Sequence, residues 1–160
     1  MFRRENAAYA LRFNEGDLQM RPKTDILILT CMDSRVDPAH FLSLDNGTAF
    51  VYRNAGGRVT DDLLRSALLS QVLGCRRIMV IHHTDCGLNR FTNGALRERV
   101  EKELELDASH IDFLPYVDLE QSVRDDVSLL RKAAAIRNEV SITGHIYDVK
   151  NGRMSDVRII

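Results

Sequence analysis

Five side chains capable of metal-binding or acid–base chemistry cluster around the ends of two apolar runs in this sequence. Cys31 ends the first run, with Asp33 and Arg35 shortly after it, and His83 ends the second run, with Cys86 three residues later. A histidine nitrogen and a cysteine sulfur at this H-x-x-C spacing can reach one ion across a turn, and Cys31 adds a third ligand if the two runs are neighbouring strands. One imidazole and two thiolates suit Zn²⁺ and leave its fourth position open, which is typical of a catalytic zinc site.

Each part of this pattern also has a plainer explanation. A single cysteine at the end of an apolar strand is usually a small buried side chain, and a lone H-x-x-C often arises by chance. It is the combination that favours a metal site. Cys75 has no partner motif and is expected to be packed. His82 points to the opposite strand face from His83, so we expect a packed or surface residue, and it is also a candidate for carrying protons to solvent. Spacing recommends none of the other histidines, at positions 40, 110 and 145.

The two apolar runs are predicted to be strands of one sheet. Strands are expected at 25–31, 49–53, 77–83, 142–149 and 155–160, and helices at 3–14, 60–74, 94–106 and 118–137. This alternation predicts an α/β fold with a mainly parallel β-sheet of about four strands plus an antiparallel edge strand, flanked by helices. The turn at Asn151-Gly152 makes the closing hairpin antiparallel. Because parallel strands place their carboxyl ends at one sheet edge, the clusters CMDSR, RNAGG and HHTDCG are expected to meet there.

Two of the expected helices carry clear signals. Thr60 is a good N-cap for the helix at 60–74, with acidic residues in the first turn and Gly74 suited to the stop. The apolar residues of that helix are expected to share one face, at positions 63, 64, 67, 68, 72 and 73. The helix at 118–137 carries one apolar stripe, at positions 119, 123, 127, 130 and 134.

Length and charge narrow the remaining possibilities. The chain has 160 residues and a formal net charge of −1, from 22 basic and 23 acidic residues. We expect a single domain over 1–160 with a helical arm at 1–20, and no nucleic-acid partner because there is no basic excess. We expect no membrane partner and a cytoplasmic location, because no stretch is long and apolar enough for a bilayer span or a signal peptide. Three cysteines do not suit a disulfide framework, so reduced thiols are expected.

Three motifs in this order resemble those of the β-class carbonic anhydrases, and in particular of their compact, short-chain branch. The motifs are C-x-D-S-R at 31–35, RNAGG at 53–57 and HTDCG at 83–87. The resemblance is strong over residues 25–90 and continues beyond them in overall pattern. It implies a zinc lyase, a carbonate dehydratase, that catalyses the reversible hydration of CO2 to bicarbonate and a proton.

The resemblance also implies that one Zn²⁺ per chain is bound by Cys31, His83 and Cys86, and that Asp33 and Arg35 form a catalytic dyad. Zinc lowers the pKa of a bound water and provides hydroxide near neutral pH. Because two thiolates neutralise the ion's charge, we expect activity to rise into the alkaline range. Asp33 can orient this hydroxide toward CO2, or take the fourth zinc position itself, and Arg35 can keep the carboxylate ionised and off the metal.

The RNAGG motif is a candidate for substrate binding. Gly56 and Gly57 let the backbone approach a small substrate and offer amide donors to a developing anion, although an ordinary tight turn explains them equally well. Arg53 is a candidate for attracting bicarbonate. In this family a second subunit completes the cleft, so a homodimer or higher homo-oligomer is expected, with the N-terminal helix embracing its neighbour.

Two other functions compete with CO2 hydration. The same zinc site can serve a carbonyl sulfide or carbon disulfide hydrolase, since relatives of the short branch resemble such enzymes. A non-catalytic zinc-stabilised scaffold is the second alternative, but all five site positions carry the residues that the resemblance to the family requires. The sequence has no C-x-x-C redox motif and no G-x-G-x-x-G dinucleotide fingerprint.

Overall fold

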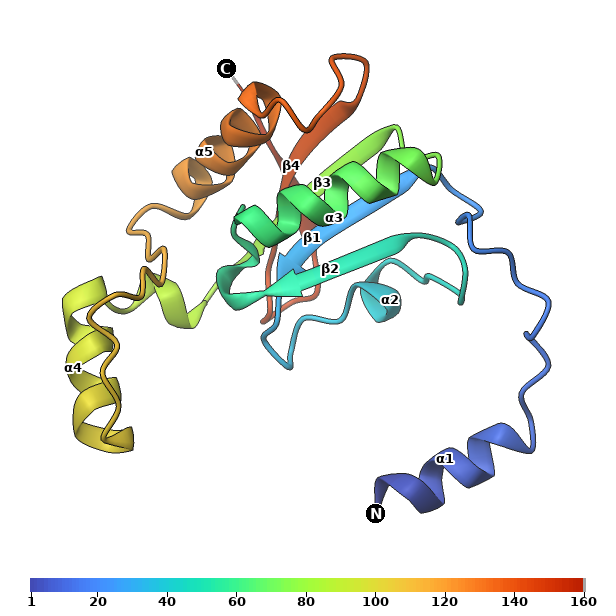
Figure 1. The fold of residues 1–160 in the computed structure, drawn as a ribbon, viewed down its shortest axis with the longest axis horizontal. Helices are drawn as coiled ribbons and strands as arrows, with labels where there is room; N and C mark the ends of the chain where they lie inside the picture. Colours follow the sequence, from blue (N-terminus) through green and yellow to red (C-terminus); the bar gives the residue numbers. More distant parts are fainter. Residues whose placement is uncertain (160) are drawn as a thin grey trace.

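The computed structural model describes residues 1–159, and its centre is a five-stranded sheet in the order β2-β1-β3-β4-β5 (Figure 1). The strands are β1 (Ile26–Cys31), β2 (Phe50–Asn54), β3 (Arg77–His83), β4 (Ser141–Tyr147) and β5 (Met154–Val157). Four of them are parallel, and β5 pairs antiparallel with β4 through the turn that contains Gly152. The predicted fold class is therefore confirmed.

The burial of each strand follows from its place in the sheet. β1 and β3 lie in the middle, and their nearly continuous apolar sequences are buried along most of their length. β2 lies at the edge and alternates between half-buried and exposed side chains. The two strand ends that carry Cys31 and His83 therefore belong to the two central, most buried strands of the sheet.

Two helices, α3 (Asp61–Val72) and α5 (Leu119–Lys132), pack against one face of the sheet. Their buried side chains join those of the strands in one core, whose fully buried members include Leu29, Leu63, Ala67, Val80, Val123, Val127 and Leu130. The predicted N-cap of α3 is confirmed, because the Thr60 hydroxyl oxygen accepts from the Leu63 amide at 3.3 Å. Asp118 caps α5 in the same way, through the Gln121 amide at 2.8 Å.

The predicted apolar face of α3 is partly wrong. Leu63 and Ala67 are buried, but Leu68 and Val72 are exposed. Ser70 and Gln71 face the core instead, and both remain satisfied there. The Ser70 hydroxyl donates to the Ala67 carbonyl at 2.8 Å, and the Gln71 amide donates to the carbonyls of Ala67 and Ala135. Satisfied hydrogen bonds allow polar side chains to replace apolar ones in a helix–sheet contact.

Several predicted ends also shift. α5 ends at Lys132, before the predicted end at 137, so Ala134 lies outside the helix and is exposed instead of completing its stripe. α4 spans Asn93–Leu104 and α1 spans Phe2–Ala10, each shorter than predicted, and the segment after Pro38 forms the short helix α2 (Pro38–Phe41). β4 ends at Tyr147 rather than at 149. Of the strand expected at 155–160, the structure has β5, and residue 160 lies outside the described residues.

α1 extends away from the rest of the molecule (Figure 1). None of its residues is buried, and the arm exposes several large apolar side chains, namely Phe2, Tyr9, Leu11 and Phe13. Such a helix gains no packing energy within its own chain. None of the described helices is long and apolar enough to cross a bilayer. The cytoplasmic location and the single domain over 1–160 stay predictions.

Gly57, in the 3₁₀ turn η1 (Ala55–Gly57) after β2, packs directly on the β1 backbone. Its φ is 69°, and a Cβ there would lie 2.9 Å from the Thr30 carbonyl carbon and 3.0 Å from the Cys31 nitrogen. We therefore predict that Gly57→Ala lowers the free energy of unfolding by about 3 kcal/mol, because the backbone strain at a positive φ and the clash of the new Cβ with the β1 backbone act together. Urea denaturation measures the change.

Gly94→Ala provides the matched control, since Gly94 lies in the first turn of α4, where a Cβ meets only the Thr92 hydroxyl at 3.9 Å. Alanine there is expected to be neutral or to stabilise by up to about 1 kcal/mol. Equal effects of the two substitutions would contradict the close approach of Gly57 to β1.

Candidate metal centre

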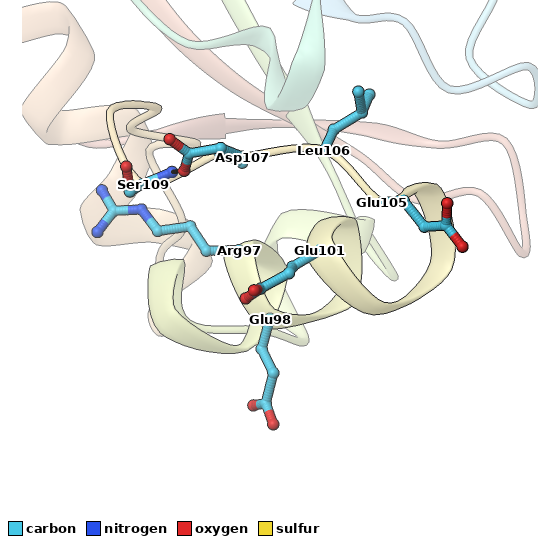
Figure 2. Close-up of a pocket in the computed structure, with 8 residues that line it drawn as sticks. Arg97, Glu98, Glu101, Glu105, Leu106, Asp107 and Ser109 are labelled. Carbon is cyan, nitrogen blue, oxygen red and sulfur yellow. Dashed lines mark hydrogen bonds between the residues drawn. The ribbon is translucent and has the colours of Figure 1, made fainter.

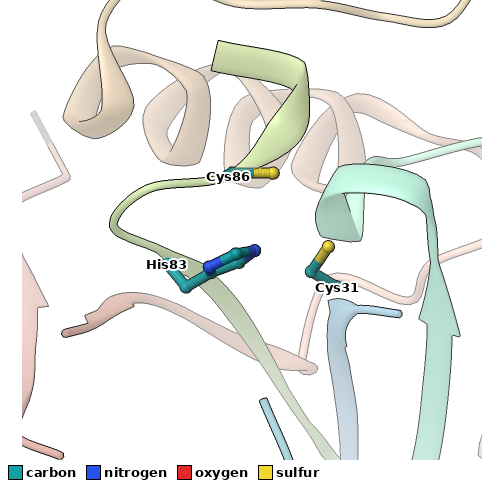
Figure 3. Close-up of side chains that lie close together, drawn as sticks. All are labelled: Cys31, His83 and Cys86. Carbon is teal, nitrogen blue, oxygen red and sulfur yellow. The ribbon is translucent and has the colours of Figure 1, made fainter. Parts of the chain in front are cut away.

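The first three predicted site residues meet at the carboxyl ends of β1 and β3. Cys31 is the last residue of β1 and His83 the last of β3, while Cys86 follows a short turn and precedes the 3₁₀ turn η2 (Gly87–Asn89). The two strands are paired in parallel, which brings these ends side by side. One ligand atom from each of the three residues lies within 4.8 Å of the others, and all three residues are buried. Figure 3 shows their side chains turned toward one another.

The imidazole of His83 is oriented as a metal ligand requires. Its Nδ1 donates to the Thr84 carbonyl at 2.9 Å, which leaves the lone pair of the neutral ring on Nε2. Among the described residues, Nε2 is buried without a hydrogen-bond partner. A buried acceptor without a donor is costly, and a cation bound at this atom removes the cost. The donor set and this unsatisfied nitrogen therefore fit a Zn²⁺ ion.

The two cysteines interact strongly with each other. A hydrogen bond from Cys31 is the main cause that lowers the pKa of Cys86, to about 3, and the same contact raises the pKa of Cys31. The backbone amide of Asp33 also approaches the Cys31 sulfur at 3.4 Å. The contact between the two sulfurs therefore favours the thiolate at Cys86, which is the form that binds a metal.

Asp33 and Arg35 form a two-pronged ion pair beside the cysteines. Arg35 Nε donates to Asp33 Oδ1 at 3.0 Å and Nη2 donates to Oδ2 at 2.7 Å. These hydrogen bonds lower the pKa of Asp33 to about 2, so its carboxyl group is ionised at neutral pH. Asp33 Oδ2 lies 3.9 Å from His83 Nε2, which places the carboxylate near the three-residue cluster while Arg35 holds it.

Sequence reasoning missed a second carboxylate on Arg35. Arg35 Nη1 donates to Asp85 Oδ2 at 2.8 Å, and Nη2 donates to the Asp85 carbonyl at 3.0 Å. Arg90 pairs with the other oxygen of Asp85, and Arg35 and Arg90 together lower the pKa of Asp85 to about 2. The only available signal was the place of Asp85 between His83 and Cys86. Arg35 therefore ties the turn after β1 to the turn after β3.

The predicted substrate-binding residues support the same loops. Arg53 Nε donates to the Cys31 carbonyl at 3.0 Å, and Arg53 Nη2 donates to the Asp33 carbonyl at 2.8 Å. Gly56 has a φ of 75°, and a Cβ there would lie 2.6 Å from a methyl group of Leu88. These contacts explain an arginine and glycines at these positions without a substrate. A role in substrate binding stays a prediction for Arg53, Gly56 and Gly57.

A cavity of about 300 Å³ opens beside the cluster. Cys31, Asp33 and Cys86 contribute to its wall, and its other side chains are mainly apolar: Met32, Ala55, Leu88, Phe91 and Leu96. The sequence did not reveal these apolar residues, because several of them follow the third motif without any periodic pattern. The cavity offers a small, weakly polar molecule a place next to the metal ligands.

A larger cavity, of about 620 Å³, lies between α4 and the segment that follows it (Figure 2). Its lining includes Glu98, Glu101, Glu105 and Asp107, together with Arg97. It contains none of the predicted site residues. Its acidic wall makes it unsuitable for an anion such as bicarbonate.

The remaining cysteine and the neighbouring histidine are packed. Cys75 is buried in the main core, as expected. His82 has no exposed surface, which agrees with a packed residue and removes it as a direct proton carrier to bulk solvent. Its ring hydrogen-bonds to Ser122 and to the Gly57 carbonyl.

Comparison with known proteins agrees with this geometry. The family model described as carbonic anhydrase matches residues 26–154. Together with the relatives below, this match shows that the chain belongs to the β-carbonic anhydrase family. The β-carbonic anhydrase 1 of Mycobacterium bovis is 36% identical over 155 residues, which cover 95% of this chain and 93% of that protein. A carbon disulfide hydrolase of Acidianus sp. is 37% identical, over 91% of this chain and 82% of that protein.

Solved structures show the same likeness. The carbonic anhydrase from Streptococcus mutans superposes with a TM-score of 0.94 at 46% identity, covering 98% of this chain and 95% of that one. An apo form of carbon disulfide hydrolase gives a TM-score of 0.75 at 32% identity, covering 98% of this chain and 88% of that one. The fold is thus that of this family.

The three-residue cluster yields a direct prediction about metal content. Replacing Cys86 by serine removes one sulfur, and we expect bound zinc to fall from about one ion per chain to a small fraction of that. Elemental analysis of the purified, dialysed protein measures the ratio. Cys75→Ser is the matched control, because Cys75 is equally buried but lies in the main core. Full zinc content in Cys86→Ser would show that this cluster is not the metal site.

Proposed function

We propose that this protein catalyses the reversible hydration of CO2 to bicarbonate and a proton, using one Zn²⁺ per chain held by Cys31, His83 and Cys86. The observation that carries the proposal is the meeting of this buried cluster, an ionised carboxylate and an apolar cavity at one sheet edge. When bound there, zinc supplies a nucleophile by acidifying a water molecule near neutral pH. The protein supplies everything else.

Asp33 is the residue placed to orient the reacting water. Its carboxylate is ionised and can only accept hydrogen bonds, so it fixes the direction of an O–H group beside it. Arg35 restrains this carboxylate through two hydrogen bonds. The same restraint opposes movement of Asp33 onto the metal, where it would occupy the fourth position. Asp33 and Arg35 therefore act as one catalytic unit.

The apolar cavity suits the substrate. CO2 is linear, has no net dipole and carries no hydrogen-bond donor, so a pocket lined by Met32, Leu88 and Phe91 holds it without a desolvation cost. The product is an anion and gains little from these walls, which favours its release. Arg53, Gly56 and Gly57 are the candidates for contact with bicarbonate as it forms.

The first test is stopped-flow CO2 hydration on protein of known zinc content. We expect rapid hydration by the wild-type protein and a fall of kcat/KM by about 10²-fold or more in Asp33→Ala, the lower limit typical of a lost acid–base or orienting group. Asp61→Ala, at the exposed start of α3, controls for the loss of one carboxylate. Zinc at full occupancy without hydration at any pH would overturn the proposed substrate.

Carbon disulfide or carbonyl sulfide is the second candidate substrate. The specific observation in its favour is the 37% identity to a carbon disulfide hydrolase, which is as high as the identity to the mycobacterial β-carbonic anhydrase 1. Both sulfur compounds are linear and apolar, like CO2. Sulfide release measured beside CO2 hydration separates the two functions. If zinc-loaded protein showed neither activity, the non-catalytic scaffold would become the better explanation.

The N-terminal arm supports an assembly of at least two copies. Phe2, Tyr9 and Phe13 are exposed on or just after a helix that has no buried residue, and the Tyr9 and Phe13 rings pack together at 5.7 Å. We propose that the arm packs against a second copy, in a homodimer or a higher homo-oligomer. Burial of such aromatic side chains is the common basis of stable subunit contacts.

We predict that Tyr9→Glu combined with Phe13→Glu shifts the wild-type oligomer toward monomer at micromolar concentration, because two charges would be buried in the contact. Sedimentation velocity measures the distribution. Leu129→Glu, on the exposed side of α5, is the control for adding charge to an apolar surface position. An unchanged oligomer in the double variant would exclude the arm as the contact.

A further inference from the structure

Arg58, His82, Ser122 and Asp126 form a buried polar cluster that contains none of the candidate metal ligands and has no part in the proposed reaction. Asp126 Oδ2 accepts from Arg58 Nε at 2.8 Å and lies 3.1 Å from His82 Nε2. His82 Nδ1 lies 2.8 Å from the Ser122 hydroxyl. All four residues are buried, and a buried ion pair pays a high desolvation cost. We therefore asked which neighbouring side chain this buried cluster positions.

The hydrogen-bond pattern fixes the orientation of the His82 ring. Nε2 faces the Asp126 carboxylate and the Gly57 carbonyl at 3.2 Å, and both of these groups only accept, so Nε2 carries a hydrogen. The ring is thereby held from α5 on one side and from η1 on the other. Arg58 is held as firmly, because its Nη1 also donates to the Leu114 carbonyl at 3.0 Å.

Tyr116 lies against both of these fixed groups. Its ring stacks on His82 at 5.8 Å between centroids with planes 24° apart, and the Arg58 guanidinium lies 5.5 Å from its centroid. Its backbone is tied to the turn that follows Cys86. The Tyr116 amide donates to the Leu88 carbonyl at 3.4 Å, and the Asn89 side chain donates to the Tyr116 carbonyl at 3.1 Å. The ring is therefore positioned relative to Cys86 from two independent directions.

The hydroxyl of Tyr116 is a buried polar group on a side chain that packs beside the metal ligands. Among the described residues this hydroxyl has no hydrogen-bond partner, which leaves its hydrogen free to donate. Tyr116 packs against the small cluster of Cys31, Cys86 and Leu88, in which the two sulfurs are the polar atoms. Burial and the neighbouring Cys86 sulfur raise the pKa of Tyr116, so the phenol stays neutral and keeps a hydrogen to donate.

We propose that Tyr116 is a positioning residue of the metal centre, whose hydroxyl donates a hydrogen bond to the Cys86 thiolate. This inference rests on the proposed metal site. A hydrogen bond on a ligating sulfur draws electron density away from the metal and fixes the direction of the sulfur lone pairs. The buried Arg58–Asp126–His82 cluster then has a purpose, since it holds the tyrosine ring at the required angle. In a site with two thiolates, this donor partly offsets the charge that the sulfurs give to the ion.

The test uses the full-length chain loaded with Co²⁺ in place of Zn²⁺. Tyr116→Phe keeps the ring and removes only the hydroxyl. Thiolate sulfur bound to Co²⁺ gives a charge-transfer band in the near ultraviolet, and loss of a hydrogen bond raises the energy of the sulfur electrons. We expect the band of Tyr116→Phe to move to longer wavelength, and the Co²⁺ dissociation constant to rise about tenfold, the lower end of the ~10–100-fold effect of lost outer partners.

Tyr52→Phe is the matched control, because the Tyr52 hydroxyl donates to Asp62 at 2.9 Å, away from the cysteines. A band at the wild-type wavelength in Tyr116→Phe overturns the proposal. If wild-type protein with Co²⁺ shows no thiolate band at all, the metal site itself is refuted. If the band is present and shifts in Tyr116→Phe but not in Tyr52→Phe, the hydrogen bond to Cys86 is supported independently of any enzymatic activity.

Discussion

The parallel pairing of β1 with β3 is the constraint on which the rest of the molecule depends. It places Thr30 opposite Ile81, so the two strands end within one residue of each other and bring Cys31 and His83 to one edge. Packing on both faces keeps the two strands in register, because a slip by one residue would move every side chain of a strand to the opposite face. The three candidate metal ligands and the Asp33–Arg35 pair all lie within a few residues of these two ends.

The positions of the strand ends also explain why the three candidate metal ligands could be predicted from the sequence. Strong apolar runs locate β1 and β3, and the rule that parallel strands end together brings Cys31, His83 and Cys86 to one place without knowledge of side-chain packing. The cluster at Asp85 and the apolar cavity lay beyond such reasoning. They depend on the path of turns, on a left-handed residue at Asp85 and on side chains from η2 and α4. No periodic pattern records those contacts.

The same limit applied to α3. A count of apolar residues predicted that Leu68 and Val72 face the core, whereas Ser70 and Gln71 occupy that face with their hydrogen bonds satisfied. Hydrophobic periodicity describes an average helix and carries no information on which carbonyl groups are within reach of a polar side chain. His82 is a second example. The position of its neighbour His83 follows from the strand end, whereas the hydrogen bonds of His82 depend on residues of α5 and η1, which the strand pattern does not reveal.

The restraint on Asp33 is built at the surface of the protein and not in its interior. Asp33, Arg35, Asp85 and Arg90 form a row of alternating charge, and the Arg35 side chain remains 46% exposed. Solvent ions reach such a row, and at physiological ionic strength they screen charges over roughly 8 Å. The buried metal ligands are insulated from this effect, but their carboxylate partner is not. The ionic strength of the surroundings therefore acts on how firmly Asp33 is held, while it leaves the geometry of the three ligands untouched.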